Sequence, residues 1–333
     1  MHSRLRRLGA LLTVATAALL GSAAAVAGPY SSLTVFGDSL SDTGNIQIAT
    51  GGATPPAPYY NGRFSDGPNW IDVLAAGLGL PGGALPALAG GSNYAFGGAR
   101  TGIDNNPPGV LAQVAGLWGS AHAVADASGL YVVVGGGNDM RDARGATSTD
   151  ASRQAAAAAA AANIFDSVAL LASRGAQHVL ISTLPDLGRT PEAVALDLVA
   201  PSSDATQRYN ALVWAMEAQL EALFSGLDVV VLDMNGIGQA IYDDPAAYGI
   251  SNVALPCTGF GAVTGGACST SLFSDALHPS AVAHTIIGNA ALALVVPAAV
   301  PLPATAALAG LGLLVLGWSR RRGTQAARAG SPV

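Results

Sequence analysis

The chain has 333 residues, of which 50% are apolar and only 11% are charged, a composition that excludes an intrinsically disordered protein. Its 2 cysteines cannot form a disulfide framework or a four-thiolate zinc site. Basic residues are concentrated at the two ends, so the body is acidic and has no basic run, which excludes nucleic-acid binding and electrostatic docking on anionic lipid.

Residues 1–27 have the pattern of a secretory signal peptide. Three arginines near the start form the charged region, residues 8–20 form the apolar stretch, and residues 25–27 (AVA) offer small side chains for cleavage. The alternative is a membrane anchor helix, but the apolar stretch is short for a segment that spans a bilayer. The leader therefore predicts export.

Short apolar runs rich in β-branched residues alternate with helical stretches through the body of the chain. Strands are predicted at residues 33–36, 130–134, 179–183 and 229–232, with a weaker fifth at 93–96. Helices are predicted at residues 70–78, 151–173 and 204–224. Strand–helix alternation with continuous apolar strands predicts an α/β fold whose parallel sheet, of about five strands, is covered by helices on both faces.

Ligands of such sheets bind beyond the carboxyl ends of the strands, so the residues that follow each apolar run are candidates for a site. The first strand leads into residues 36–45 (FGDSLSDTGN), and Ser39 is expected at a turn into a helix, where the positive end of the dipole favours a developing oxyanion. The segment at 93–96 leads into two glycines, Gly97 and Gly98, which let backbone N–H groups approach a ligand. The next strand is followed by residues 135–139 (GGGND), which add the side-chain amide of Asn138.

Near the end of the body, residues 275–279 (DALHP) place Asp275 and His278 three positions apart. On a helical turn, residues with this spacing share a face, so Asp275 is expected to orient His278. Taken singly, Ser39 also fits a helix cap and His278 also fits a buried core histidine. Their order after successive strands favours a nucleophile, a base and oxyanion donors gathered at one sheet edge.

In this order the motifs resemble those of the GDSL (SGNH) serine hydrolases, in the branch that holds secreted phospholipases, haemolysins and plant lipases. The resemblance covers essentially the whole body, with blocks at residues 36–45, 61–67 (NGRFSDG), 93–99 (NYAFGGA), 136–139, 184–191 (LPDLGRTP) and 275–279. It implies the three-layer α/β/α, flavodoxin-like fold of that family.

The resemblance assigns catalytic roles to particular residues of this chain. Ser39 matches the nucleophile, His278 the general base and Asp275 the residue that orients the base. The oxyanion hole is matched by the backbone N–H groups of Ser39 and Gly98 and the side-chain amide of Asn138, with the preceding glycine as the alternative to Gly98. No cofactor is implied, and no metal site is predicted, because the remaining histidines have no partners at metal-ligand spacing.

Cys257 and Cys268 lie 11 positions apart in a segment rich in Gly, Thr and Ser. Export to an oxidising compartment favours a disulfide between them. The alternative is two isolated buried thiols, because spacing alone does not determine whether the geometry allows a bond.

The C-terminal region combines residues 300–303 (VPLP), an apolar run at 304–318 and an arginine cluster at 320–322. The run is marginal for a bilayer span of about 20 residues, and the positive-inside rule places the arginines in the cytoplasm. The arrangement resembles the PEP-CTERM sorting signal of exopolysaccharide-producing Gram-negative bacteria, with Leu302 where Glu is most usual. The resemblance implies transient membrane contact, processing by a sorting protease, and then release or surface attachment. A plain anchor helix is the alternative.

Together these patterns predict an exported single-domain hydrolase that cleaves carboxylic esters through an acyl-enzyme on Ser39. The predicted boundaries are a signal peptide at 1–27, the hydrolase domain at 28–296, the sorting segment at 297–323 and a short tail at 324–333. Expected substrates are small-molecule, lipid or acylated-polysaccharide esters. The expected location is the periplasm, cell surface or extracellular matrix of a Gram-negative bacterium.

Two alternatives to hydrolysis remain open at this point. One is an acyltransferase that uses the same acyl-enzyme, and the other is a non-catalytic surface or matrix module built on the hydrolase scaffold. The sequence also leaves open the acyl chain length, the natural alcohol and the oligomeric state.

Overall fold

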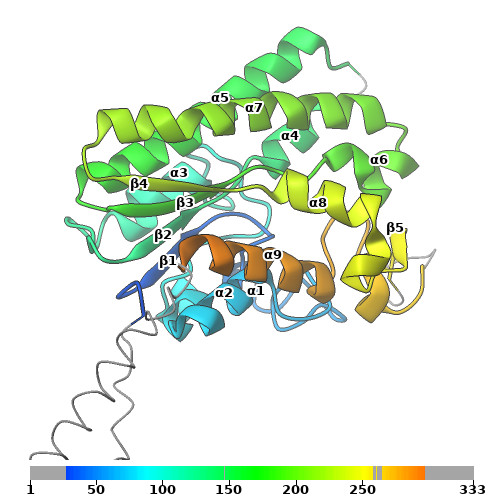
Figure 1. Cartoon of the computed structure of the whole chain (residues 1–333), viewed down its shortest axis with the longest axis horizontal. Coiled ribbons are helices and arrows are strands. Elements are labelled where there is room, and N and C mark those ends of the chain that lie inside the picture. The colour runs from blue at the N-terminus through cyan, green and yellow to red at the C-terminus, as the bar shows by residue number, and fades with distance from the viewer. Residues whose placement is uncertain (1–27, 146, 258–259, 261–264, 297–333) are drawn as a thin grey trace, which may run out of the picture. The chain divides into compact units, whose positions relative to one another are not determined.

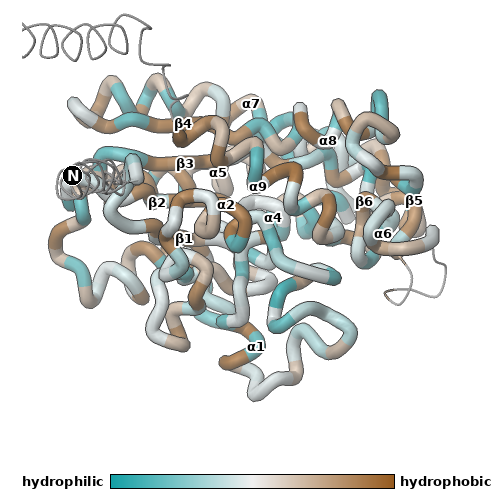
Figure 2. The backbone as a smooth tube through the Cα atoms, turned by 60° about the horizontal axis from the view of Figure 1, so that its bottom comes forward, coloured by the Kyte–Doolittle hydropathy of each residue, from teal (hydrophilic) through white to brown (hydrophobic). Residues whose placement is uncertain are grey.

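A parallel β-sheet forms the centre of the computed structural model, which describes residues 28–145, 147–257, 260 and 265–296. The sheet consists of β1 (Leu33–Phe36), β2 (Leu130–Val133), β3 (His178–Ser182) and β4 (Asp228–Leu232), adjacent in that order. All residues of β1 and β2 are buried, as expected for parallel strands covered on both faces, and Figure 2 shows the strands as largely hydrophobic. The four main strand predictions are confirmed to within one residue at each end.

The fifth predicted strand, at 93–96, does not form. This segment runs along the free edge of β1 and makes a single parallel bridge between Val35 and Asn93. Backbone hydrogen bonds from the Tyr94 N–H to the Val35 carbonyl (2.7 Å) and from the Phe96 N–H to the Gly37 carbonyl (3.1 Å) hold the segment against β1. The segment at 93–96 thus lies along one edge of β1, and β2 pairs with the other edge. The end of β1 is therefore the topological switch point, where α/β sheets bind ligands.

Helices cover both faces of the sheet (Figure 1). α5 (Asp150–Ser173) and α7 (Val199–Leu223) pack together on one face, and α2 (Trp70–Leu78) and α9 (Ala281–Val295) pack together on the other. Thr149 caps α5 through a reciprocal pair of hydrogen bonds with Ser152, and the alanine tract that follows favours the helix. The predicted three-layer α/β/α arrangement is confirmed.

α7 begins at Val199, five residues before the predicted start at 204. The sequence around residues 201–204 (PSSD) is typical of a helix start, which is why the prediction began there. Pro201 instead lies in the first turn of α7, where its missing N–H would have had no partner in any case.

Shorter elements connect these layers. The helices among them are α1 (Asn45–Ala49), η1 (Pro81–Ala84), η2 (Ala87–Ala89), α3 (Val110–Ala112), η3 (Gln113–Trp118), α4 (Gly137–Ala143), η4 (Leu187–Arg189), α6 (Pro191–Ala195), α8 (Met234–Asp243), η5 (Pro245–Tyr248) and η6 (Cys268–Thr270). A second, two-stranded parallel sheet is formed by β5 (Asn252–Pro256) and β6 (Ser271–Phe273), which the sequence analysis does not predict.

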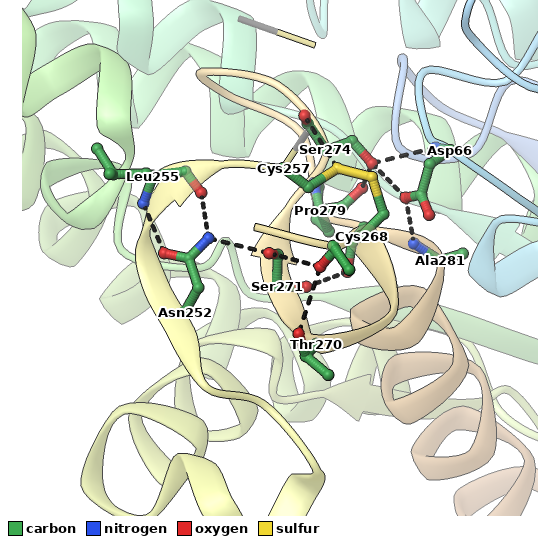
Figure 3. Close-up of a disulfide and its surroundings, with 12 residues drawn as sticks. Asp66, Asn252, Leu255, Cys257, Cys268, Thr270, Ser271, Ser274, Pro279 and Ala281 are labelled. Atoms are coloured by element: carbon green, nitrogen blue, oxygen red, sulfur yellow. Dashed lines mark hydrogen bonds between the residues drawn. A yellow bond between two sulfur atoms is a disulfide. The ribbon is translucent and has the colours of Figure 1, made fainter. Parts of the chain in front are cut away.

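Cys257 and Cys268 form a disulfide with a Cα–Cα distance of 4.8 Å, next to Ser274 and Asp66 (Figure 3). Asp66 accepts hydrogen bonds from the Ser274 hydroxyl (2.6 Å) and the Ala281 N–H (2.8 Å). Asp66 and the two sulfurs form the one candidate group of metal ligands found among the described residues, but bonded sulfurs are not thiolate ligands. The disulfide instead braces the segment that leads to Asp275.

Within the described part of the chain, α5 is the one helix long and apolar enough to cross a membrane by length and composition. Ala157, Ile164 and Leu171 on this helix are buried in the same core as residues of β2, β3 and β4, so α5 is accounted for as a core helix. The predicted leader (1–27) and sorting segment with its tail (297–333) lie outside the described residues. The predicted domain boundaries therefore stay predictions.

Candidate active site

Ser39 is buried in a tight turn directly after β1, at the switch point of the sheet. The turn is closed by the Asp38 carbonyl, which accepts the N–H groups of Ser41 (3.0 Å) and Asp42 (2.9 Å). The expectation that a helix starts at this turn is wrong, because α1 begins only at Asn45. Any stabilisation of negative charge at Ser39 therefore comes from individual N–H groups and not from a helix dipole.

His278 lies between Ser39 and Asp275. Its Nε2 is 2.9 Å from the Ser39 Oγ, although the two residues are 239 positions apart, and its Nδ1 is 2.6 Å from the Asp275 Oδ2. The structure thus brings the three residues into one hydrogen-bonded line. This is the arrangement in which a base removes a proton from a hydroxyl while a carboxylate orients the base.

Asp275 and His278 are not on a helical turn, contrary to the expectation from their spacing. Residues 274–278 form a series of bends instead. The Asp275 Oδ1 accepts the backbone N–H groups of Leu277 (2.7 Å) and His278 (2.6 Å), a local side-chain turn that competes with helix formation. The side chains still meet because this turn directs the imidazole back toward the carboxylate.

Tyr59 is a member of the site that sequence reasoning missed. Its hydroxyl donates a hydrogen bond to the Asp275 Oδ2 (2.5 Å) across 216 positions of sequence. Burial alone raises the pKa of Asp275, but hydrogen bonds from His278 and Tyr59 and the positive charge on His278 outweigh it and lower the pKa to about 2. Asp275 is therefore a carboxylate over the whole physiological pH range. The one sequence feature that indicated a functional role for this region is the nearby NGRFSDG block at residues 61–67.

A cluster of aromatic rings lies beside His278. The Phe64 ring centroid lies 5.1 Å from that of His278, and Tyr59 contacts both Phe64 (6.0 Å) and Phe260 (4.9 Å). These contacts limit rotation of the imidazole and of the Tyr59 side chain. Both therefore stay in the orientation that the hydrogen bonds require.

The expected oxyanion donors lie on two loops that contact each other. The Asn138 Nδ2 donates a hydrogen bond to the Ala99 carbonyl (2.9 Å), which joins the start of α4 to the glycine loop. Gly97 donates its N–H to Asp42 (2.8 Å), whereas within the described residues neither Ser39 nor Gly98 donates its N–H to any acceptor. Of the two adjacent glycines, Gly98 is thus the one with an N–H available to a ligand.

Asp42 is a second residue that sequence reasoning missed. Its buried carboxylate accepts N–H groups from Gly44 (2.7 Å), Asn45 (2.7 Å), Ile46 (3.1 Å) and Gly97 (2.8 Å). It therefore ties the loop after β1 to the glycine loop. Asp42 lies in the first motif, but the sequence does not show which backbone N–H groups donate hydrogen bonds to its carboxylate.

Asp38, directly before Ser39, is also buried. Burial raises its pKa to about 6, while the hydrogen bond from the Leu40 N–H (3.0 Å) opposes this rise. A carboxyl group that titrates near neutral pH therefore lies directly behind the serine.

A cavity of about 280 Å³ adjoins Ser39, Asn138 and His278. Most of its surface is apolar and comes from the loop after β3, from α8, from the end of β6 and from α9, while polar side chains such as Arg141, Arg189 and Gln239 also line it. Gly98 does not line this cavity.

A family model described as GDSL-like Lipase/Acylhydrolase matches residues 33–291. The chain belongs to this family. The match contains every residue of the hydrogen-bonded line, from Ser39 to His278. The α/β fold with its parallel sheet is the SGNH-hydrolase fold of the family.

Curated relatives include lipases, esterases and an acyltransferase. Lipase 1 of Photorhabdus luminescens is 36% identical over 207 residues (60% of this chain and 29% of the lipase). The phosphatidylcholine-sterol acyltransferase of Aeromonas hydrophila is 30% identical over 234 residues (69% of this chain and 66% of the acyltransferase). Esterase EstA of Pseudomonas putida is 28% identical over 338 residues (84% of this chain and 50% of the esterase). The chain thus spans less than two thirds of the length of these relatives.

Among solved structures, an acetylxylan esterase from Geobacillus stearothermophilus is similar, with a TM-score of 0.47 and 13% identity over 81% of this chain and 95% of the esterase.

Proposed function

We propose that this protein is a secreted serine hydrolase that cleaves carboxylic esters through an acyl-enzyme on Ser39. The observation that carries the proposal is the hydrogen-bonded line from Ser39 through His278 to Asp275. Membership of a family of lipases and acylhydrolases supports it, as do the esterases and lipases among the relatives.

In the first half of the reaction, the Ser39 Oγ attacks the acyl carbon while the His278 Nε2 takes the hydroxyl proton. Asp275 stabilises the imidazolium that forms. The N–H groups of Ser39 and Gly98 and the side-chain amide of Asn138 donate hydrogen bonds to the former carbonyl oxygen and stabilise its negative charge. His278 then donates the proton to the leaving alcohol, and the acyl group remains as an ester on Ser39.

In the second half, water takes the place of the alcohol. His278 removes a proton from the water, whose oxygen attacks the acyl carbon of the Ser39 ester. Collapse of the second tetrahedral intermediate returns the proton to the Ser39 Oγ and releases the carboxylic acid.

Replacing the nucleophile tests the proposal. Ser39→Ala should lower kcat for p-nitrophenyl ester hydrolysis on the order of 10³-fold or more, because no other group supplies the attacking oxygen. Ser120→Ala, at an exposed serine, is the matched control and should hydrolyse the ester like the wild type. A folded Ser39→Ala protein with near-native turnover would remove Ser39 from the mechanism.

Acyl transfer is the second candidate, favoured by the acyltransferase relative from Aeromonas hydrophila. The same acyl-enzyme serves both reactions, and only the acceptor differs. Product analysis with an added alcohol separates them: a transferase forms the new ester in preference to the free acid, whereas a hydrolase forms mainly the acid in water.

The proposal includes export to the periplasm, cell surface or extracellular matrix, with a sorting protease acting on the C-terminal segment. It is supported by the leader pattern, by the arginine cluster at 320–322 and by a disulfide of the kind that persists in oxidising compartments.

A further inference from the structure

The cavity beside Ser39 is larger than the reaction itself requires. The reacting groups line only one part of it, at Ser39, Asn138 and His278. The remaining walls include Leu184, Phe273 and Ile287, from three different segments of the chain. An acetyl group would leave most of this apolar space unfilled.

One wall is the inward face of α8. Met234, Ile237, Gly238 and Ile241 all line the cavity and follow the spacing i, i+3, i+4 and i+7, which is one face of a helix. An amphipathic helix normally buries such a face against other side chains. Here Ile237 and Gly238 are only half-buried, because the cavity lies in front of them.

Gly238 keeps this wall open. A Cβ built at Gly238 would meet no atom within 4 Å, whereas one at Gly236 in the same helix would lie 2.3 Å from the Asp233 carboxylate. Gly238 is thus not required by close packing, and glycine is a poor helix former. Its missing side chain leaves room for a ligand.

We propose that this cavity binds the acyl chain of the substrate ester, that the chain is of medium length, and that Gly238 determines how long a chain fits. This inference rests on the proposed function, because it places the acyl group of the Ser39 ester. At about 30 Å³ for a water-sized group, the 280 Å³ cavity holds about nine such groups, close to the size of an octanoyl chain. The apolar walls match an aliphatic acyl chain better than a glycerol or sugar alcohol, which is polar.

The wild-type protein should show this preference in a series of p-nitrophenyl esters that differ only in acyl length. Each buried methylene group favours transition-state binding by about fourfold, so the six groups added from acetyl to octanoyl should raise kcat/KM on the order of 10³-fold, after which it should level off once the cavity is filled. Octyl acetate carries a chain of the same length on the alcohol side. Its kcat/KM should show no comparable gain over that of ethyl acetate, which has the same kind of leaving group.

Gly238→Leu should fill part of the cavity with its side chain. With two or three fewer methylene groups accommodated, the ratio of kcat/KM for octanoyl to that for acetyl ester should fall on the order of 30-fold. Gly116→Leu is the matched control. Gly116 is exposed in η3, a Cβ there also meets nothing within 4 Å, and this variant should keep the wild-type ratio.

Product inhibition of the wild type provides a measurement that does not depend on how a variant folds. Octanoate should inhibit acetyl ester hydrolysis competitively and far more strongly than acetate or butyrate, because only its chain fills the cavity.

The outcomes separate this inference from the proposed function. Three results for the wild type would each overturn the acyl assignment and leave the esterase proposal intact. They are equal kcat/KM values for acetyl and octanoyl esters, an absence of inhibition by octanoate, and an equal gain in kcat/KM when the long chain lies on the alcohol side. An unchanged ratio in a folded Gly238→Leu protein would overturn the role of Gly238. Absence of hydrolysis of every ester in the series would instead overturn the proposed function.

Discussion

Tyr59 extends the line of Ser39, His278 and Asp275 by one more hydrogen bond. Asp275 must stay ionised and keep its orientation while the imidazole gains and loses a proton. The Tyr59 hydroxyl satisfies an oxygen of this buried carboxylate and helps to hold its pKa at about 2. We therefore assign Tyr59 as a positioning residue, which acts on the reaction through Asp275.

Tyr59→Phe should lower kcat/KM several-fold and move the acid limb of the pH–rate profile to higher pH. Without the hydrogen bond, the pKa of Asp275 rises from about 2, and its carboxylate attracts the imidazolium that forms during the reaction more strongly. The measurement is kcat/KM against pH from 5 to 9. Tyr60→Phe, at an exposed neighbouring tyrosine, is the control and should leave the profile in place. A rate loss in Tyr59→Phe without any movement of the acid limb would mean that Tyr59 only supports the local packing.

At the scale of elements, the site is assembled from loops that are tied together by buried polar groups. Asp42 holds the glycine loop against the turn after β1 through the Gly97 N–H (2.8 Å). On the opposite side, the Cys257 N–H donates to the Phe273 carbonyl (3.0 Å), and Ser274 contacts Asp66, so the disulfide lies next to the segment that carries Asp275. The candidate catalytic residues are thus supported by cross-links between loops more than by regular helices.

The double variant Cys257→Ser/Cys268→Ser should unfold more easily than the oxidised wild type. Closing a loop between residues 11 positions apart restricts the unfolded chain, and its loss should cost about 3 kcal/mol of unfolding free energy. Urea denaturation measures the difference, and reduced wild-type protein is the control, because it should unfold like the double variant. Equal stability of all three proteins would show that the disulfide does not stabilise the fold.

For the molecule as a whole, we propose that the two terminal segments determine where the activity is used. Seven of the 15 basic residues lie in these segments, and the body between them is acidic. Loss of both segments would leave a negatively charged enzyme, with no basic run to hold it on an anionic membrane.

If residues 300–322 are a sorting signal, protein recovered from the native host should lack the cluster Arg320 to Arg322. The apolar run before this cluster is short for a lasting anchor, and two prolines, within the sequence VPLP at 300–303, precede the run. Intact-mass measurement on protein from the cell surface and from the inner membrane tests this directly. Protein that retains Arg322 and stays in the inner membrane would identify the segment as an ordinary anchor.

Local patterns in the chain were enough to predict the main elements and the principal site residues. The strands at residues 33–36 and 130–133 are continuous apolar runs, and α2 follows a capping residue, Asn69, so burial and capping act over neighbouring positions. Ser39 and Asn138 were predicted as site residues because parallel strands bring the residues that follow them to one edge, and Gly98 was predicted, with Gly97 as the alternative, from the resemblance to the family.

Only the tertiary structure decided which distant groups meet. The Tyr59–Asp275 hydrogen bond spans 216 positions, and the cavity is bounded by α8, α9 and the loop after β3, so no local pattern reveals either one. The two expected helical turns also depended on where polar groups find partners. Asp42 accepts the N–H groups of Asn45 and Ile46 at the start of α1, so this helix begins only after the turn that carries the serine. Asp275 accepts the backbone N–H groups of the two residues before Pro279, and the turn there is not helical. Periodicity reports which side of an element is buried, whereas the partner that satisfies a polar group depends on how the whole chain packs.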